Sequence, residues 1–289
     1  MSLRLHMLQV ARLAPRSLGD ATELVRAFLR SRVDASGAGL DRAGKPDLYY
    51  SIFVLAGLQA LDEPMPEIAS FLRSFGDGDG LDFIHLGALA RCRAAIGSHD
   101  FAGELLARSE RHRSRDGGYD VEPGAERGNA YGCFVALGAY QDLAREQPEP
   151  LRMVQCLKLL ETPDGAWGNL RGMKQGTVPA TAAAITLLHQ LGMPLNEAVG
   201  DWLLAQAHPQ GGWIAVPGAP IPDLLSTATA LHALACLDRP LPTAMRERCL
   251  DFIDSLWNAE GGFHGHWADD ELDAEYTFYG LLALGHLSA

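Results

Sequence analysis

The feature that most constrains the fold is a glycine-plus-aromatic turn that recurs along the chain at nearly even spacing. The clear copies read DGGY, DGAW, QGGW and EGGF, at residues 116–119, 164–167, 210–213 and 260–263. Each copy follows an amphipathic segment with apolar residues at helical intervals, and each precedes a polar loop and a second helical segment. A period of roughly 40–50 residues is typical of folds that stack one supersecondary unit on the next.

The second segment of each copy is apolar nearly all round, which indicates a helix buried on both sides. These segments begin at Ala130, Ala180, Ser226 and Ala274. Two weaker copies precede them, with turns that read GAGL at 37–40 and GDGL at 78–81. The chain therefore divides into helix pairs at about residues 18–62, 63–97, 98–143, 147–192, 194–238 and 240–289.

The end of the repeat array favours a ring over an open solenoid. An open stack needs a polar terminal cap, whereas the last buried segment runs into ALGHLSA and leaves no room for one. We therefore expect a single all-α domain over residues 1–289, an (α/α)6 toroid with inner helices surrounded by outer ones. Parallel inner helices direct their N-terminal N–H groups, with partial positive charge, at one cavity, where an anion is stabilised.

Composition excludes several classes of protein. A net charge of −12 and a pI near 5.2 argue against nucleic-acid binding, which needs clustered Lys and Arg. No apolar run approaches the ~18 residues of a membrane span, and the first residues lack the apolar stretch of a signal peptide. We interpret them as an amphipathic helix rather than a transit peptide, and we expect a cytoplasmic protein. Buried, reduced thiols are expected for Cys92, Cys133, Cys156, Cys236 and Cys249.

The repeated helix pairs and turns resemble the β subunits of protein prenyltransferases and, more loosely, the squalene and terpene cyclases. The resemblance covers nearly the whole chain, and WLLAQAHPQGGW at 202–213 is similar to the glutamine-tryptophan repeat of the cyclases. It implies a toroid that binds an isoprenoid or another lipid in a central apolar cavity. It leaves open whether the chain works with a partner protein subunit or as a homodimer.

The stretch GLDRAGKPDLYYS at 39–51 carries the most specific part of the resemblance. In the prenyltransferases one repeat has Arg, two residues, Lys, and then Pro-Asp-x-Cys-Tyr-Ser. Tyr49 stands at the zinc-binding Cys of that motif, and His85 in DFIH matches a zinc-binding His of the next repeat. The other matching residues are Arg42, Lys45, Pro46, Asp47, Tyr50 and Ser51.

Two metals follow from these resemblances as hypotheses, and neither is required. Zinc would be held by Asp47 and His85, although a catalytic zinc site uses three protein ligands and Tyr49 is a poor replacement for a thiolate. The alternative is that Asp47 caps its helix and His85 makes a core hydrogen bond. Magnesium is suggested by the Asp-Asp-x-x-Asp string at 269–273, which resembles the motif of ionising terpene synthases but falls in a loop.

Cations and aromatic residues near the inner-helix starts suggest how an isoprenyl diphosphate would bind. The loop cations are either diphosphate contacts or solvated rim charges; they are Arg42, Lys45, Arg127, Arg171 and Lys174. Tyr49, Tyr50, Tyr131 and Tyr276 are expected to line the cavity around the isoprenoid tail. His189, His232 and His286 lie in the C-terminal halves of their helices, where packing or dipole roles are expected.

Three functions remain open at this level. The first is a prenyltransferase-like protein that binds an isoprenoid or its diphosphate and transfers a prenyl group, with Asp47, Tyr49, Tyr50 and His85 as the catalytic candidates. The second is a noncanonical terpene cyclase that acts by protonation or ionisation, although PDLLSTA at 222–228 keeps only Asp223 and the Thr-Ala of the cyclase acid motif. The third is a catalytically inactive toroid that binds a partner protein or lipid.

Overall fold

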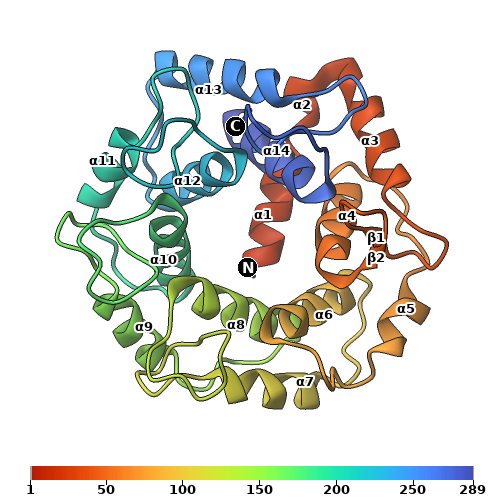
Figure 1. The fold of residues 1–289 in the computed structure, drawn as a ribbon, viewed down its shortest axis with the longest axis vertical. Helices are drawn as coiled ribbons and strands as arrows, with labels where there is room; N and C mark the ends of the chain where they lie inside the picture. Colours follow the sequence, from red (N-terminus) through yellow and green to blue (C-terminus); the bar gives the residue numbers. More distant parts are fainter. Residues whose placement is uncertain (1, 289) are drawn as a thin grey trace.

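The computed structural model describes residues 2–288 and arranges them as a closed ring of paired helices (Figure 1). The inner helices are α4 (Leu48–Ala60), α6 (Phe83–Ala95), α8 (Ala130–Asp142), α10 (Val178–Gln190), α12 (Leu224–Cys236) and α14 (Ala274–Leu287). The outer helices are α3 (Thr22–Ser31), α5 (Ala69–Ser74), α7 (Ala102–Ser109), α9 (Pro150–Leu159), α11 (Ala198–Ala205) and α13 (Thr243–Leu256). Each inner helix packs against the next, and α14 packs against α4. The prediction of an all-α toroid is confirmed.

Short elements complete the ring. The pieces that precede or follow outer helices are α2 (Pro15–Leu18), the 3-10 turns η1 (Gly19–Ala21) and η2 (Glu110–His112), and the two-residue strands β1 (Gly39–Leu40) and β2 (Pro46–Asp47). The strands pair antiparallel, with Gly39 opposite Asp47, and hold the loop that carries Arg42 and Lys45. No helix within residues 2–288 is both long enough and apolar enough to cross a membrane.

Every inner helix begins with a side-chain cap. The capping oxygen accepts a hydrogen bond from the backbone N–H three residues later, which satisfies one of the N–H groups that a helix start leaves free. The capping residues are Asp47, Asp82, Asn129, Thr177, Asp223 and Asp273. The carboxylate of Asp47 therefore caps α4, as the alternative to the zinc hypothesis expects.

The glycine-aromatic turns are fastened to the inner helices by a buried hydroxyl. The backbone N–H of Trp213 donates to Thr227 Oγ1 at 2.9 Å, and that hydroxyl in turn donates to the Asp223 carbonyl. The same bond recurs from Trp167 to Thr181 at 3.0 Å and from Phe263 to Thr277 at 3.3 Å. In these three repeats one buried hydroxyl therefore sets the register between turn and helix, because an unpaired buried N–H is costly.

In the DGGY, QGGW and EGGF turns the first glycine lies against the outer helix of the following pair. A Cβ atom on Gly211 would overlap the carbonyl oxygen of Arg248 in α13, and one on Gly261 would overlap that of Leu24 in α3. Both glycines also have positive φ, +99° and +93°, which other residues rarely adopt. Since α3 belongs to the first pair and Gly261 to the last, this contact closes the outer layer of the ring.

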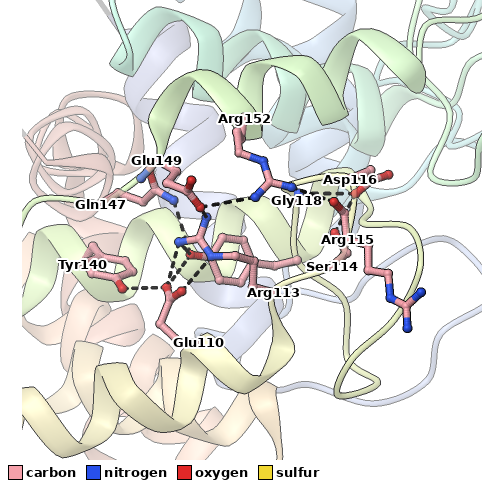
Figure 2. Close-up of polar contacts among 11 residues, drawn as sticks. Glu110, Arg113, Ser114, Arg115, Asp116, Gly118, Tyr140, Gln147, Glu149 and Arg152 are labelled. Atoms are coloured by element: carbon pink, nitrogen blue, oxygen red, sulfur yellow. Dashed lines mark hydrogen bonds and ion pairs between the residues drawn. The ribbon is translucent and has the colours of Figure 1, made fainter.

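A charged network fixes the turn of the third pair (Figure 2). Glu110 accepts hydrogen bonds from the hydroxyls of Tyr119 and Tyr140, both at 2.6 Å, and pairs with Arg113 at 2.7 Å. Burial alone would raise the pKa of Glu110, but these hydrogen bonds outweigh it and lower the pKa. Arg113 also reaches Glu149, just before α9. The network is structural, because none of these residues lines the central cavity and together they join η2, α8 and the next outer helix.

The N-terminal helix α1 (Leu3–Ala11) stands inside the ring (Figure 1). Its residues Leu3, Met7 and Leu8 are buried, and it packs against α14, α4 and α8. Leu3 N–H donates to Gln141 at 2.8 Å and Arg4 pairs with Asp142 at 3.1 Å, both at the C-terminal end of α8. The helix was expected, but its place is a new finding: α1 closes the end of the ring opposite the inner-helix N-termini.

Candidate functional site

A cavity of about 520 Å³ fills the centre of the ring. Leu3, Arg4 and Met7 of α1 form its floor, and its aromatic wall consists of Tyr49, Phe53, Tyr131, Phe134, Phe278 and Tyr279. The exposed members of its lining, Tyr131 (42%), Val216 (45%) and Asn169, stand at or before inner-helix starts, so the mouth is at that end. The volume falls within the ~300–1,000 Å³ of typical small-molecule sites, and the lining suits an apolar ligand.

One carboxyl group is hydrogen-bonded to a phenol of the cavity wall. Tyr49, the second residue of α4, donates from its hydroxyl to Glu275 Oε1 at 2.8 Å, and Glu275 is the second residue of α14. Burial raises the pKa of Glu275, the hydrogen bond from Tyr49 lowers it, and the neighbouring charge of Asp273 raises it again, so the net shift is upward. Burial also raises the pKa of Tyr49, which therefore stays a neutral phenol. The pair is a candidate proton donor at the mouth side of the cavity.

Arg42 lies at the rim, where ion pairs hold it in place. Its guanidinium pairs with Asp273 at 2.7 Å and Asp269 at 2.9 Å, and it stacks 5.5 Å from the centre of the Tyr276 ring. These ion pairs raise the pKa of Arg42 against the effect of burial. Two aspartates of the Asp-Asp-x-x-Asp string therefore neutralise Arg42, and Asp273 also caps α14.

The remaining predicted cations lie outside the cavity. Lys45, Arg127, Arg171 and Lys174 are exposed on the loops that lead into the inner helices, and none of these four lines the cavity. Tyr276 likewise lies beneath Arg42 rather than on the wall, whereas Tyr49 and Tyr131 do line the cavity. Contacts from the loop cations to an anion at the rim stay a prediction.

The predicted zinc donors do not form a three-ligand set. Asp47 caps α4, and His85 Nδ1 lies 2.8 Å from the Asp82 carboxylate. Within residues 2–288 neither belongs to a group of three metal-binding side chains, and Tyr49, at the third position, is engaged with Glu275. Tyr50 packs edge-on against Tyr49, with ring centres 5.8 Å apart. Asp47, His85 and Tyr49 therefore do not fit a catalytic zinc ion, which uses three protein ligands.

Two charged residues of the cavity wall were missed in the sequence. Arg91 lines the cavity from the third turn of α6, and among residues 2–288 it has no ion-pair partner and its buried Nε has no hydrogen-bond partner. Asp142 lies nearby but pairs with Arg4; burial raises its pKa against the charges of Arg91 and Arg4. The usable signal was a charged residue within the span of a mostly apolar inner helix.

Comparison with known proteins agrees with this architecture. The model of the prenyltransferase alpha-alpha toroid domain matches residues 6–85 and 180–288. Among solved structures, the type II terpene cyclase MstE from Scytonema is similar in fold without ligand (14% identity, 94% of this chain and 98% of that chain covered, TM-score 0.62). A variant of MstE in complex with its substrate, geranylgeranyl dihydroxybenzoate, is similar as well (15% identity, 95% and 97% covered, TM-score 0.61).

A third similar structure, a protein from Actinoplanes, shares 16% identity over 93% of this chain and 98% of that one, with a TM-score of 0.57. No curated protein sequence matches the chain. At these identities the structural neighbours establish the fold alone. The family model, however, spans well over half of the chain, on both sides of the junction where α14 meets α4. The chain therefore belongs to the prenyltransferase alpha-alpha toroid domain family.

Proposed function

We propose that the protein binds an isoprenoid chain in its central cavity and cyclises it by protonation, with Glu275 and Tyr49 as the proton donor. The observation that carries this proposal is the Tyr49–Glu275 hydrogen bond of 2.8 Å, because it couples a carboxyl of raised pKa to an apolar, aromatic cavity. A general acid must be protonated at the working pH, and burial favours the neutral form. The substrate in complex with the MstE variant, geranylgeranyl dihydroxybenzoate, is a ligand of the matching chemical class.

The reaction needs no oxidant, reductant or second substrate. In the acid form the Glu275 carboxyl donates to the Tyr49 oxygen, the reverse of the hydrogen bond that its carboxylate accepts. The carboxyl proton passes to that oxygen while the Tyr49 hydroxyl proton passes to the terminal alkene carbon, whose π electrons form the new C–H bond. The resulting carbocation is attacked by further double bonds, and a final proton loss returns the carboxyl to its acid form. Faces of aromatic rings such as Phe53 and Phe278 stabilise the cation. The product is an isomer of the substrate.

An acidic head group on the isoprenoid fits the other end of the cavity. Ile84 of α6 and Tyr49 of α4 are both the second residue of an inner helix, so they stand at the same level of the ring. Arg91 lies seven residues beyond Ile84, and at 1.5 Å per residue it is about 10 Å deeper in the cavity than Tyr49. Among the described residues Arg91 forms no ion pair, because Asp142 is paired with Arg4. A carboxylate at Arg91 would place the hydrocarbon tail in the aromatic part of the cavity, toward Glu275.

Arg91→Met is expected to weaken binding of geranylgeranyl dihydroxybenzoate by about 10–100-fold, because a charge-assisted hydrogen bond contributes about 1.5–3 kcal/mol. Affinity for the methyl ester of the same compound, which lacks the charge, should change little. Isothermal titration with both compounds measures the difference. Arg127→Met is the matched control at the exposed rim; a larger loss in that variant would place the anion at the loops and contradict the role of Arg91.

The test of the function itself is turnover. The wild-type chain is incubated with geranylgeranyl dihydroxybenzoate and the extract is analysed for cyclised isomers of unchanged mass. Cyclisation supports the proposal. Tight binding without any product would indicate a catalytically inactive isoprenoid-binding toroid, and release of diphosphate from a prenyl diphosphate with transfer to an acceptor would favour prenyl transfer instead.

A further inference from the structure

A cluster of imidazoles and one thiol lies where α1 meets the ring. His6 comes from α1, and His232 and Cys236 come from α12, one helical turn apart. One ligand atom from each of the three residues can be chosen so that all lie within 4.8 Å of one another. His286 of α14 adjoins them, with its Nε2 3.0 Å from His232 Nδ1. This cluster is at the floor of the cavity, far along the inner helices from Asp47 and His85.

His232 is buried with one ring nitrogen unused. The residue is 1% exposed, and its Nε2 has no hydrogen-bond partner among residues 2–288. Its Nδ1 is engaged with His286, so either tautomer leaves Nε2 without a partner. If Nδ1 carries the proton, Nε2 keeps a bare lone pair inside the protein. A buried polar atom in that state calls for a ligand.

The donor atoms are of the types that bind a metal. His6 and His232 each offer an imidazole nitrogen, and Cys236 is a buried free thiol. A bound cation would displace the thiol proton to solvent and leave a metal–thiolate bond. Two imidazole nitrogens and one thiolate form a set that favours Zn²⁺ and similar ions over Mg²⁺ or Ca²⁺.

We propose that His6, His232 and Cys236 bind one zinc-class divalent ion, with His286 orienting the His232 ring, and that the ion ties α1 to the ring. The nitrogen and sulfur ligands of a tetrahedral zinc ion lie about 3.3–3.6 Å apart, so the three ligand atoms move about 1 Å closer together when the ion binds. The hydrogen bond from His232 Nδ1 to His286 is the outer contact that metal-bound histidines usually make. The site is independent of the proposed cyclisation, since neither Glu275 nor Tyr49 takes part.

In the experiment the full chain, without a tag, reduced and treated with EDTA, is titrated with Co²⁺. The ligand-field bands of Co²⁺ report tetrahedral geometry, and a charge-transfer band reports a thiolate ligand. One equivalent is expected to bind with both signals, and Zn²⁺ should displace it. Cys236→Ser should remove the charge-transfer band, and His6→Asn, on the half-buried side of α1, should weaken binding at least 100-fold. His286→Asn should weaken it by about 10–100-fold, the usual effect of losing an outer contact.

Two further measurements separate the proposal from its rivals. Zinc should slow amide exchange across residues 3–11 in the wild type and not in His6→Asn, because only a ligand on α1 couples the ion to that helix. His85→Ala and the exposed control His99→Ala should leave the titration unchanged. Binding that is substoichiometric, that lacks the thiolate band, or that disappears in His85→Ala while surviving in His6→Asn overturns the proposal.

Discussion

Glu275→Gln is expected to lower kcat for cyclisation by about 10²–10⁴-fold, the usual contribution of a general acid. Glutamine can still accept the Tyr49 hydrogen bond, so the cavity keeps its shape while the ionisable proton is lost. Affinity for geranylgeranyl dihydroxybenzoate should therefore remain within a few-fold of the wild type. Single-turnover product analysis, together with isothermal titration of each variant, separates the loss of chemistry from a loss of binding.

Asp223→Asn is the matched control for this substitution. Asp223 is another carboxyl at an inner-helix start whose pKa is raised by burial, but it caps α12 by accepting from Ser226 N–H. Asparagine caps helices as well as aspartate does, so the fold is kept and turnover should be little changed. If Asp223→Asn abolished cyclisation and Glu275→Gln did not, the acid would be Asp223 and the proposed assignment would be wrong.

The pH profile of the same reaction gives a second check on Glu275. The carboxylic acid form is required and its pKa is raised, so the rate should be highest below the folded-state pKa and fall tenfold per pH unit above it. The Tyr49 hydrogen bond favours the carboxylate and lowers this pKa. Tyr49→Phe should therefore slow the reaction and move the falling limb to higher pH, whereas a purely structural role of Tyr49 would leave the limb in place.

Gly261→Ala is expected to lower the free energy of unfolding by about 3–5 kcal/mol. Alanine at positive φ costs about 1–2 kcal/mol, and its Cβ would overlap the Leu24 carbonyl, so α3 must move away from the last turn. Because that contact joins the first and last pairs, the loss falls on ring closure. Urea unfolding followed by circular dichroism measures the change in midpoint and slope.

Gly165→Ala is the corresponding change in the DGAW turn. Gly165 has φ +83°, close to that of Gly261, but a Cβ there would meet no atom within 4 Å. Only the conformational cost of about 1–2 kcal/mol applies. Equal losses in the two variants would mean that the approach of the last turn to α3 contributes nothing to stability.

The repeat was predictable because its chemistry is local. Turn, cap and buried hydroxyl lie within one pair, so the spacing from Trp213 to Thr227 is visible as a repeated pattern. The same locality identified Asp47 as a helix cap and placed Tyr49 at the inner-helix start. Tyr49 was singled out for the thiolate it replaces, and the structure adds its hydrogen bond to Glu275.

Residues that act across the ring could not be paired from the chain alone. Arg42 meets Asp273, 231 positions away, and nothing in either segment indicates the other. His232 was assigned a packing or dipole role, and His6 was not singled out. The two residues belong to different helices with unrelated patterns, so nothing in the sequence pairs them. Arg91 stands in a mostly apolar helix together with Arg93, and what distinguishes it is the cavity that it lines.

The position of α1 has a consequence for how the chain is made. Among the described helices α1 comes before every inner helix in the chain, yet the helix that it packs against most extensively is α14, the last of them in chain order. Until α14 has formed, the apolar face of α1 and one side of each unfinished inner helix are exposed to solvent. Contacts this distant in sequence form slowly, and exposed apolar helices aggregate or recruit chaperones. The helix that seals the mature cavity therefore waits long for its main partner, and folding of this chain should be most vulnerable before α14 joins the ring.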